Sequence, residues 1–349
     1  MINISIGNRV VGDGHPAFII AEIAQAHDGS LGTAHAYIDA LSEIGVDAVK
    51  FQTHIAQFES TKDEPFRLKF SRQDESRYDY WLRMEFTKKQ WTGLASHARE
   101  KGLVFLSSAF SMQAVKMLHE IGMPAWKVGS GEFRSKELLI EMGKTGAPIL
   151  LSTGMSTYAE IDVMVNVMRE RGASFAIFQC TSRYPTSFED VGLNVIDILR
   201  KRFDCPVGLS DHSGTIYPGL AALARGINLL EVHVTFDRRL FGPDISASIT
   251  MDELKLLTEA RNAFRVMDQH PVDKDAMVIR LKEMRTLFSK SVALVRPFSA
   301  GSVITDNMLM AKKPGTGIPY AERHKIIGLQ LVRDVTPDRI LNWEDVDEN

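Results

Sequence analysis

The segment Phe18-Ile-Ile-Ala-Glu-Ile23 is short, almost entirely apolar and rich in β-branched residues. Seven further segments of this kind follow it, and stretches with helical periodicity separate them. Near-continuous hydrophobicity predicts parallel strands that are covered on both faces. The seven segments are residues 48–53, 104–109, 125–130, 148–153, 175–181, 206–211 and 229–234.

The stretches between these segments predict amphipathic helices. Several of them end at a glycine, such as Gly45 and Gly122, as a left-handed helix cap requires. A strand followed by a helix implies a right-handed crossover to the next parallel strand. Eight such units within about 260 residues predict an α/β fold of the (β/α)8 TIM barrel type.

The composition is that of a globular protein without an overall basic surface. The 349 residues are 44% hydrophobic and 24% charged, and the formal net charge is -3. Nucleic acid and anionic membranes are therefore not expected as partners. The N-terminal stretch does not resemble a signal peptide, and no apolar run approaches the roughly 20 residues that span a bilayer. A cytoplasmic location is expected.

Three parts are predicted along the chain. Residues 1–265 form the catalytic barrel, and residues 266–288 form a charged linker with one helix. Residues 289–349 contain short strand-like pieces separated by glycine and proline, which predicts a small β-rich domain. A domain of about 60 residues is marginally stable alone, so we expect it to pack on a barrel.

Polar residues gather where a TIM barrel has its active site, at the C-terminal ends of the strands. A polar group in an otherwise apolar strand costs free energy unless it has a partner, so this clustering indicates a site. The candidate residues are Glu22, Lys50, Gln52, Ser108, Phe110, Lys127, Ser130, Glu132, Ser152, Tyr184, Ser210, His212, Glu231 and His233.

The two histidines of this set predict a metal site. His212 and His233 come from the ends of adjacent strands, so their imidazoles can approach one ion. Two imidazoles leave positions open for water and a substrate oxygen, which suits a divalent Lewis acid. Mn2+ and Mg2+ both suit such a site, and the residues alone do not choose between them. A structural hydrogen-bonding role is the competing interpretation of each histidine.

The lysines and serines of the same set predict a small substrate that carries both a phosphate and a carboxylate. Lys50 and Lys127 supply positive charge, and the serine hydroxyls supply donors. A lysine inside a barrel could instead form a Schiff base, which is the main competing mechanism. Glu22 and Glu132 are candidates for orienting water or moving a proton. Residues 55–85 are charged and rich in aromatics, and they predict a lid or a peripheral decoration.

The motifs at these positions resemble those of the sialic acid (N-acetylneuraminate) synthases. The similarity covers nearly the whole chain, because Lys313-Pro-Gly-Thr-Gly-Ile-Pro319 resembles part of their C-terminal antifreeze-like (SAF) domain. The other motifs include Val49-Lys-Phe-Gln-Thr-His54, Trp126-Lys-Val-Gly-Ser-Gly-Glu132, Cys180-Thr-Ser-Arg-Tyr-Pro185, Gly208-Leu-Ser-Asp-His-Ser213, Glu231-Val-His233 and Gly242-Pro-Asp244.

The resemblance implies a transferase that condenses phosphoenolpyruvate with N-acetylmannosamine or a related amino sugar, giving a nine-carbon 2-keto-3-deoxy acid and phosphate. His212 and His233 would bind the metal that polarises the sugar aldehyde. Lys50, Ser108, Lys127, Ser130, Ser152 and Ser210 would bind phosphoenolpyruvate, and Gln52, Phe110, Tyr184 and Asp244 would bind the sugar. Glu22 and Glu132 would handle water and protons. Relatives that make legionaminic or pseudaminic acid share these motifs.

The resemblance also implies a homodimer in which the terminal domain of one subunit covers the barrel of the other. The family contributes an arginine from that domain, and the matching residue here is Lys313. Ala26 and Ala109 are further departures, because relatives often have asparagine and proline at these positions. These departures concern the acceptor sugar more than the reaction. A non-catalytic sugar-binding or ice-binding protein is the remaining alternative.

Overall fold

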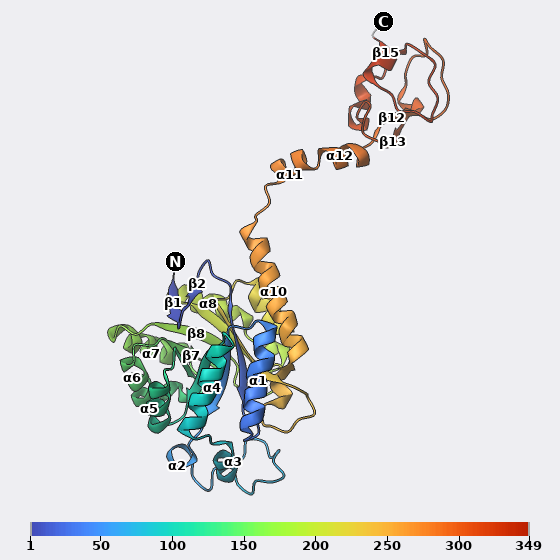
Figure 1. Ribbon diagram of the computed structural model, residues 1–349. Helices are drawn as coiled ribbons and strands as arrows, with labels where there is room; N and C mark the ends of the chain where they lie inside the picture. The colour runs from blue at the N-terminus through green and yellow to red at the C-terminus, as the bar shows by residue number, and fades with distance from the viewer. Residues whose placement is uncertain (1, 348–349) are drawn as a thin grey trace. The chain divides into compact units, whose positions relative to one another are not determined.

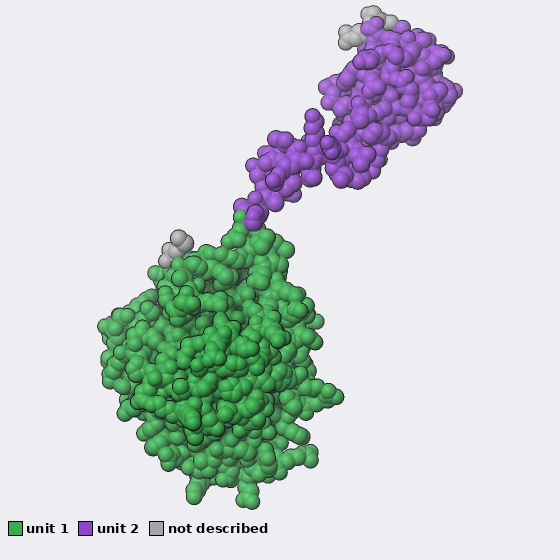
Figure 2. Space-filling model, in the orientation of Figure 1, with its two compact units in different colours: residues 1–269 green, residues 270–349 purple. Residues whose placement is uncertain are grey.

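The computed structural model describes residues 2–347 and divides the chain into two compact units, residues 1–269 and 270–349 (Figure 2). The first unit is a parallel barrel surrounded by helices (Figure 1). Its strands follow the order β5-β4-β3-β10-β9-β8-β7-β6, and β5 also lies against β6. The predicted TIM barrel is confirmed.

The eight barrel strands match the predicted segments closely. Each observed strand begins and ends within a few residues of its predicted segment. The strands are β3 (Phe18–Ala24), β4 (Ala48–Thr53), β5 (Val104–Ala109), β6 (Trp126–Val128), β7 (Ile149–Ser152), β8 (Phe175–Cys180), β9 (Val207–Asp211) and β10 (Leu229–Thr235). A short strand, β11 (Ser248–Thr250), extends the sheet beside β10.

Helices cover the outer face of the barrel and bury its apolar side chains. Thr87 begins α4 with a capping box, and Gly45 ends α1 at φ 84°, a left-handed conformation that favours glycine. The barrel helices are α1 (Leu31–Ile44), α4 (Lys88–Glu100), α5 (Met112–Ile121), α6 (Lys136–Lys144), α7 (Tyr158–Glu170), α8 (Leu193–Phe203), α9 (Tyr217–Ala224) and α10 (Met251–Gln269).

An N-terminal hairpin packs against the inside of the barrel, and it was not predicted. Its strands β1 (Asn3–Ile6) and β2 (Arg9–Gly12) pair antiparallel. Ile4, Ile6 and Val11 are buried in one cluster with barrel-interior residues such as Phe18 and Phe178. In Figure 1 this hairpin lies at the opposite end of the barrel from α3 (Arg77–Met84).

The loop after β4 folds on itself around an apolar cluster. It contains α2 (Ala56–Glu59) and α3, and Tyr80, Trp81 and Met84 are buried in it. Arg83 donates to Asp74 and to Asp28, so one side chain ties the loop both to itself and to the turn after β3. The loop is therefore an ordered cover at the C-terminal end of the strands.

The second unit begins with two helices, α11 (Lys274–Arg280) and α12 (Lys282–Phe288), where one helix was predicted. They are separate because Leu281, at φ -98° and ψ 20°, leaves helical geometry between them. The unit then forms two antiparallel strand pairs, β12 (Ser291–Leu294) with β13 (Leu309–Lys312) and β14 (Gln330–Leu331) with β15 (Val346–Asp347). Val292, Ile304 and Leu341 lie in its own small core. No helix among residues 2–347 has the length and hydropathy to cross a membrane.

Candidate active site

The C-terminal ends of the barrel strands surround a cavity of about 450 Å³. Every site residue predicted in the barrel contributes to its lining. The strand register accounts for part of this convergence, because Glu22 on β3 lies beside Lys50 on β4 and beside His233 on β10. Lys313 belongs to the second unit, where its Nζ lies 4.9 Å from the centroid of the Phe288 ring.

Two lysines and two glutamates form a buried cluster at the base of the cavity. Lys50 Nζ lies 2.5 Å from Glu22 Oε2, and Lys127 Nζ lies 3.1 Å from Glu231 Oε1. Lys50 Nζ is also 3.9 Å from Glu231 Oε2, so this carboxylate faces both ammonium groups. All four side chains are at most 5% exposed. Charges this deeply buried are stable only when they are paired.

The two glutamates of the cluster have opposite protonation properties. Burial raises the pKa of Glu22 to about 7, because desolvation outweighs the attraction of Lys50. Burial alone would also raise the pKa of Glu231, but the charges of Lys127 and Lys50 lower it to about 2. Near neutral pH Glu231 is a carboxylate, while Glu22 exchanges a proton readily. The cluster then carries net positive charge and suits an anionic substrate.

Serine hydroxyls accompany the two lysines. Lys50 donates to Ser108 Oγ at 3.2 Å, and Lys127 donates to Ser152 Oγ at 2.5 Å. Ser210 donates to Glu231, and Ser130 Oγ accepts a hydrogen bond from the backbone amide of Gly154. A Cβ at Gly154 would lie only 2.9 Å from Ser130 Oγ, so glycine is required for this close approach. The hydroxyls are thus positioned around a small volume beside the ammonium groups.

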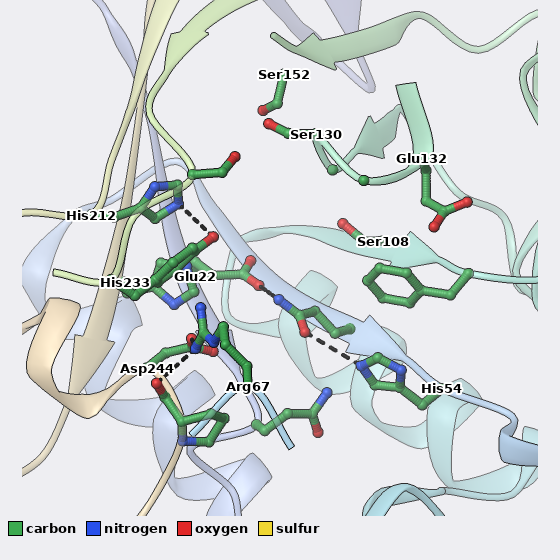
Figure 3. Close-up of a pocket in the computed structure, with 18 of the residues that line it drawn as sticks. Glu22, His54, Arg67, Ser108, Ser130, Glu132, Ser152, His212, His233 and Asp244 are labelled. Atoms are coloured by element: carbon green, nitrogen blue, oxygen red, sulfur yellow. Dashed lines mark hydrogen bonds and ion pairs between the residues drawn. The ribbon is translucent and has the colours of Figure 1, made fainter. Parts of the chain in front are cut away.

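His212 and His233 lie side by side, with ring centroids 5.2 Å apart (Figure 3). His212 Nδ1 lies 3.1 Å from the carbonyl oxygen of Thr181, which fixes a proton on Nδ1 and makes Nε2 the acceptor nitrogen of the ring. Burial raises the pKa of Tyr184 well above its usual value, so its hydroxyl stays protonated and donates to His212 Nε2 at 3.1 Å. Burial also lowers the pKa of His233 well below its usual value, which keeps the imidazole neutral.

This donor set fits a divalent ion that retains open coordination positions. Neutral imidazoles are the form that binds metal, and burial gives His233 that form. The pKa of His212 is raised, because Cys180 and the Thr181 carbonyl outweigh the effect of burial, so an ion competes with a proton there. Among residues 2–347, no group of three or more histidine, cysteine or carboxylate side chains is arranged around one ion position. The two imidazoles would therefore share an ion with water or substrate oxygens.

A hydrogen-bonded chain that the sequence did not reveal leads from the loop to Glu22. Glu59 Oε1 lies 2.5 Å from His54 Nδ1, His54 Nε2 lies 3.4 Å from Gln52 Oε1, and Gln52 Nε2 donates to Glu22 Oε1 at 3.0 Å. The imidazole of His54 stacks between Trp81 and Phe110. This chain fixes the orientation of the Gln52 amide beside Glu22. His54 lies in a quoted motif, but nothing in its spacing indicated this role.

Arg67 and Gln25 are two of the other lining residues that the sequence reasoning missed. Arg67, on the loop after β4, donates to Asp244 and to the carbonyl of Pro243. Gln25, just after β3, is 2% exposed, and neither atom of its amide has a partner among the described residues. The carboxylate of Glu132 accepts a hydrogen bond from the Ser135 hydroxyl at 2.8 Å. Gln25 and Glu132 therefore have capacity to bind a substrate.

A TIM barrel with paired imidazoles and a lysine–glutamate cluster at the C-terminal ends of its strands has the features of a barrel enzyme with an anionic substrate. The family model for the NeuB family matches residues 37–271. The chain therefore belongs to the NeuB family, and the resemblance that its motifs indicated is confirmed.

Relatives and solved structures agree with this membership. Human N-acetylneuraminate-9-phosphate synthase is 32% identical, and the match covers 98% of this chain and 96% of the relative. N,N'-diacetyllegionaminic acid synthase of Campylobacter jejuni is 31% identical over 93% of this chain and 98% of the relative. The crystal structure of the N-acetylneuraminic acid synthetase from Leptospira borgpetersenii has a TM-score of 0.71 and 29% identity, covering 82% of this chain and 97% of that one.

Proposed function

We propose that the protein condenses phosphoenolpyruvate with an N-acylated amino sugar to give a nine-carbon 2-keto-3-deoxy sugar acid and inorganic phosphate. The observation that carries the proposal is that the lysine–glutamate cluster, with its accompanying serine hydroxyls, and the two imidazoles line one cavity. A doubly anionic donor and an aldehyde acceptor require these two environments next to each other.

Phosphoenolpyruvate binds at the base of the cavity in this proposal. Lys50 and Lys127 supply the charge, while Ser108, Ser130, Ser152 and Ser210 donate to its phosphate and carboxylate oxygens. The ion-paired state of the lysines also argues against a Schiff base. Burial alone would lower the pKa of Lys50, but the negative charges of Glu22 and Glu231 raise it by more. The amine of Lys50 is therefore protonated and not nucleophilic.

His212 and His233 would hold the metal, for which we propose Mn2+, with Mg2+ or Co2+ as alternatives. When bound, the ion supplies Lewis acidity at the aldehyde oxygen of the open-chain sugar. The protein fixes one imidazole through the Thr181 carbonyl and keeps the other neutral by burial. Gln52, Phe110, Tyr184 and Asp244 would orient the sugar so that its aldehyde faces carbon 3 of phosphoenolpyruvate.

Carbon 3 of phosphoenolpyruvate attacks the aldehyde carbon, water adds to the cationic carbon 2, and the resulting tetrahedral intermediate expels phosphate by carbon–oxygen cleavage. Glu22 is suited to take the proton of that water, because its pKa of about 7 lies near neutral pH. Glu132, which follows β6 and lines the same cavity, is the second candidate for handling water and protons.

We also propose a cytoplasmic homodimer in which the terminal domain of one subunit covers the barrel of the other. The separate core of the second unit supports this, since it folds around its own apolar cluster. Lys313 would then lie over the acceptor sugar, where lysine keeps the charge of the family's arginine but not its planar fork. N-acetylmannosamine is the proposed acceptor, and legionaminic or pseudaminic acid precursors are the alternatives.

The test is to strip the protein of metal and follow phosphate release from phosphoenolpyruvate with a panel of N-acylated amino sugars and ions. Release that needs both a sugar and a divalent ion is expected. Borohydride trapping of pyruvate together with full activity in chelator would replace this proposal with a Schiff-base aldolase. Sugar binding without phosphate release for any acceptor would indicate a non-catalytic protein.

A further inference from the structure

Arg67 extends from the loop after β4 to Asp244, one of the residues that are expected to hold the sugar (Figure 3). Its Nη2 donates to Asp244 Oδ1 at 2.7 Å and to the Pro243 carbonyl at 2.8 Å. Its guanidinium carbon lies 4.2 Å from the centroid of the Tyr184 ring, a cation–π distance. We propose that Arg67 is a specificity-determining residue of the acceptor subsite, where its pairing with Asp244 selects an uncharged sugar over a phosphorylated one. This inference rests on the proposed function.

The first support is the charge of the cavity wall. Among the described lining residues, each lysine and arginine already lies within 3.2 Å of a carboxylate oxygen. The four cations are Lys50, Arg67, Arg77 and Lys127, and the six carboxylates are Glu22, Glu59, Glu64, Glu132, Glu231 and Asp244. Lys313, brought over the cavity in the proposed dimer, would leave carboxylates in the majority.

The two arginines are the cations nearest the mouth, since the side chain of Arg67 is 42% exposed while Lys50 and Lys127 are almost fully buried. Arg77 is paired with Glu64 at 3.2 Å and donates to the Pro65 carbonyl. The deep lysines serve the phosphate and carboxylate of phosphoenolpyruvate in the proposed function. A second phosphate, at the far end of the acceptor, would therefore have to bind near Arg67 or Arg77.

A phosphate is recognised best by a guanidinium or ammonium group that offers it two or more donors and has no carboxylate on the side from which the phosphate approaches. Arg67 offers only Nε and Nη1, because both hydrogens of Nη2 are committed to Asp244 and Pro243 and one face of the guanidinium is covered by Tyr184. A phosphate that displaced Asp244 would leave that carboxylate unpaired beside a dianion, and like charges at this distance repel. The neutral amide of Gln25, which has no protein partner among the described residues, suits a hydroxyl or acyl group instead.

The experiment compares N-acetylmannosamine with N-acetylmannosamine 6-phosphate as acceptors, with phosphate release from phosphoenolpyruvate as the readout. We expect kcat/KM for the unphosphorylated sugar to be at least about tenfold higher. Equal values, or a preference for the 6-phosphate, would overturn the inference and leave the proposed function standing. If no phosphate is released with either sugar or with any other amino sugar, the proposed function is overturned instead.

Two variants test whether Arg67 itself sets this preference. Asp244→Asn frees the guanidinium, so the ratio of kcat/KM for the 6-phosphate to that for the unphosphorylated sugar should rise at least fivefold. Arg67→Ala should raise the KM for the unphosphorylated sugar about tenfold while the KM for phosphoenolpyruvate stays within twofold. If Asp244→Asn is inactive with both sugars, the Arg67→Ala result decides, and an unchanged sugar KM would remove Arg67 from the subsite.

A matched control frees an arginine outside the cavity. Asp162→Asn breaks the ion pair between Asp162 on α7 and Arg202 on α8, which is 2.5 Å long. This variant should leave the ratio between the two acceptors unchanged. A rise in the ratio equal to that of Asp244→Asn would mean that overall charge, and not Arg67, sets the preference.

Discussion

The carboxylate of Glu231 lies 3.1 Å from the ammonium group of Lys127, and both side chains are at most 5% exposed. Glu231 also faces Lys50 at 3.9 Å, so a single carboxylate stabilises two buried charges. This relationship makes Glu231 a residue on which stability and substrate binding both depend.

Glu231→Gln should lower the free energy of unfolding by about 3–5 kcal/mol, the usual cost of leaving a buried charge without its partner. Urea denaturation at neutral pH measures the loss. Glu120→Gln, which breaks an exposed pair with Lys88, is the control and should cause no measurable change. If the free energy of unfolding falls no more than in the control, the buried charge of Lys127 does not need Glu231 as its partner.

The raised pKa of Glu22 predicts a pH-dependent contribution to stability. Its pKa is about 7 in the folded protein and near 4.5 in the unfolded chain, so the folded state holds the proton more tightly. The stabilisation is complete below about pH 4.5 and is lost as pH rises through 7, a change of about 3 kcal/mol. The free energy of unfolding of wild type minus that of Glu22→Gln should fall as pH rises from 5 to 8, because glutamine resembles the protonated carboxyl and does not titrate. A constant difference would contradict the assignment.

His212→Ala and His233→Ala should each abolish turnover and weaken binding of the divalent ion, because two imidazoles are the expected protein ligands. The fold should persist, since neither histidine belongs to an apolar core cluster. Equilibrium dialysis with Mn2+ and circular dichroism measure the two effects. His119→Ala, on the exposed side of α5, should change neither. Near-normal activity in either site variant would remove the metal assignment.

Arg83→Ala should loosen the loop after β4 without affecting the barrel. Arg83 is bound to Asp74 and Asp28 at 2.7 Å each, and these contacts fasten the loop to the turn after β3. We expect faster proteolysis between residues 60 and 76 and a KM for the sugar raised several-fold, with the KM for phosphoenolpyruvate unchanged. Lys88→Ala is the control. Protease resistance equal to wild type would show that the loop is held by its apolar cluster alone.

The barrel could be predicted because its strands are buried on both faces and therefore continuously apolar. Leu229–Thr235 illustrates this, since all seven of its residues are buried and the predicted segment was 229–234. The hairpin of β1 and β2 was missed, although Ile4 and Ile6 alternate with polar residues and Gly7-Asn8 is a typical turn. These strands are short, and a short alternation carries little signal.

The site residues on strands could be placed in one cavity from sequence, because parallel strands end at the same rim. Arg67 and His54 could not be placed in the cavity from sequence, because their contacts depend on how the loop after β4 folds back. A loop has no periodic pattern from which its fold could be predicted. The roles of the predicted residues, including the metal pair, stay predictions that the variants above test. Gln25 was missed because only its burial without partners makes it notable.

The hairpin of β1 and β2 also bears on the order of events during turnover. Ile4, Ile6 and Val11 fill the interior at one end of the barrel, so substrates and products share the opening at the other end. The lysine cluster lies deeper than Arg67 and Asp244. A sugar bound first would stand between solvent and the base of the cavity, and steady-state kinetics should accordingly be sequential and ordered, with phosphoenolpyruvate entering before the sugar.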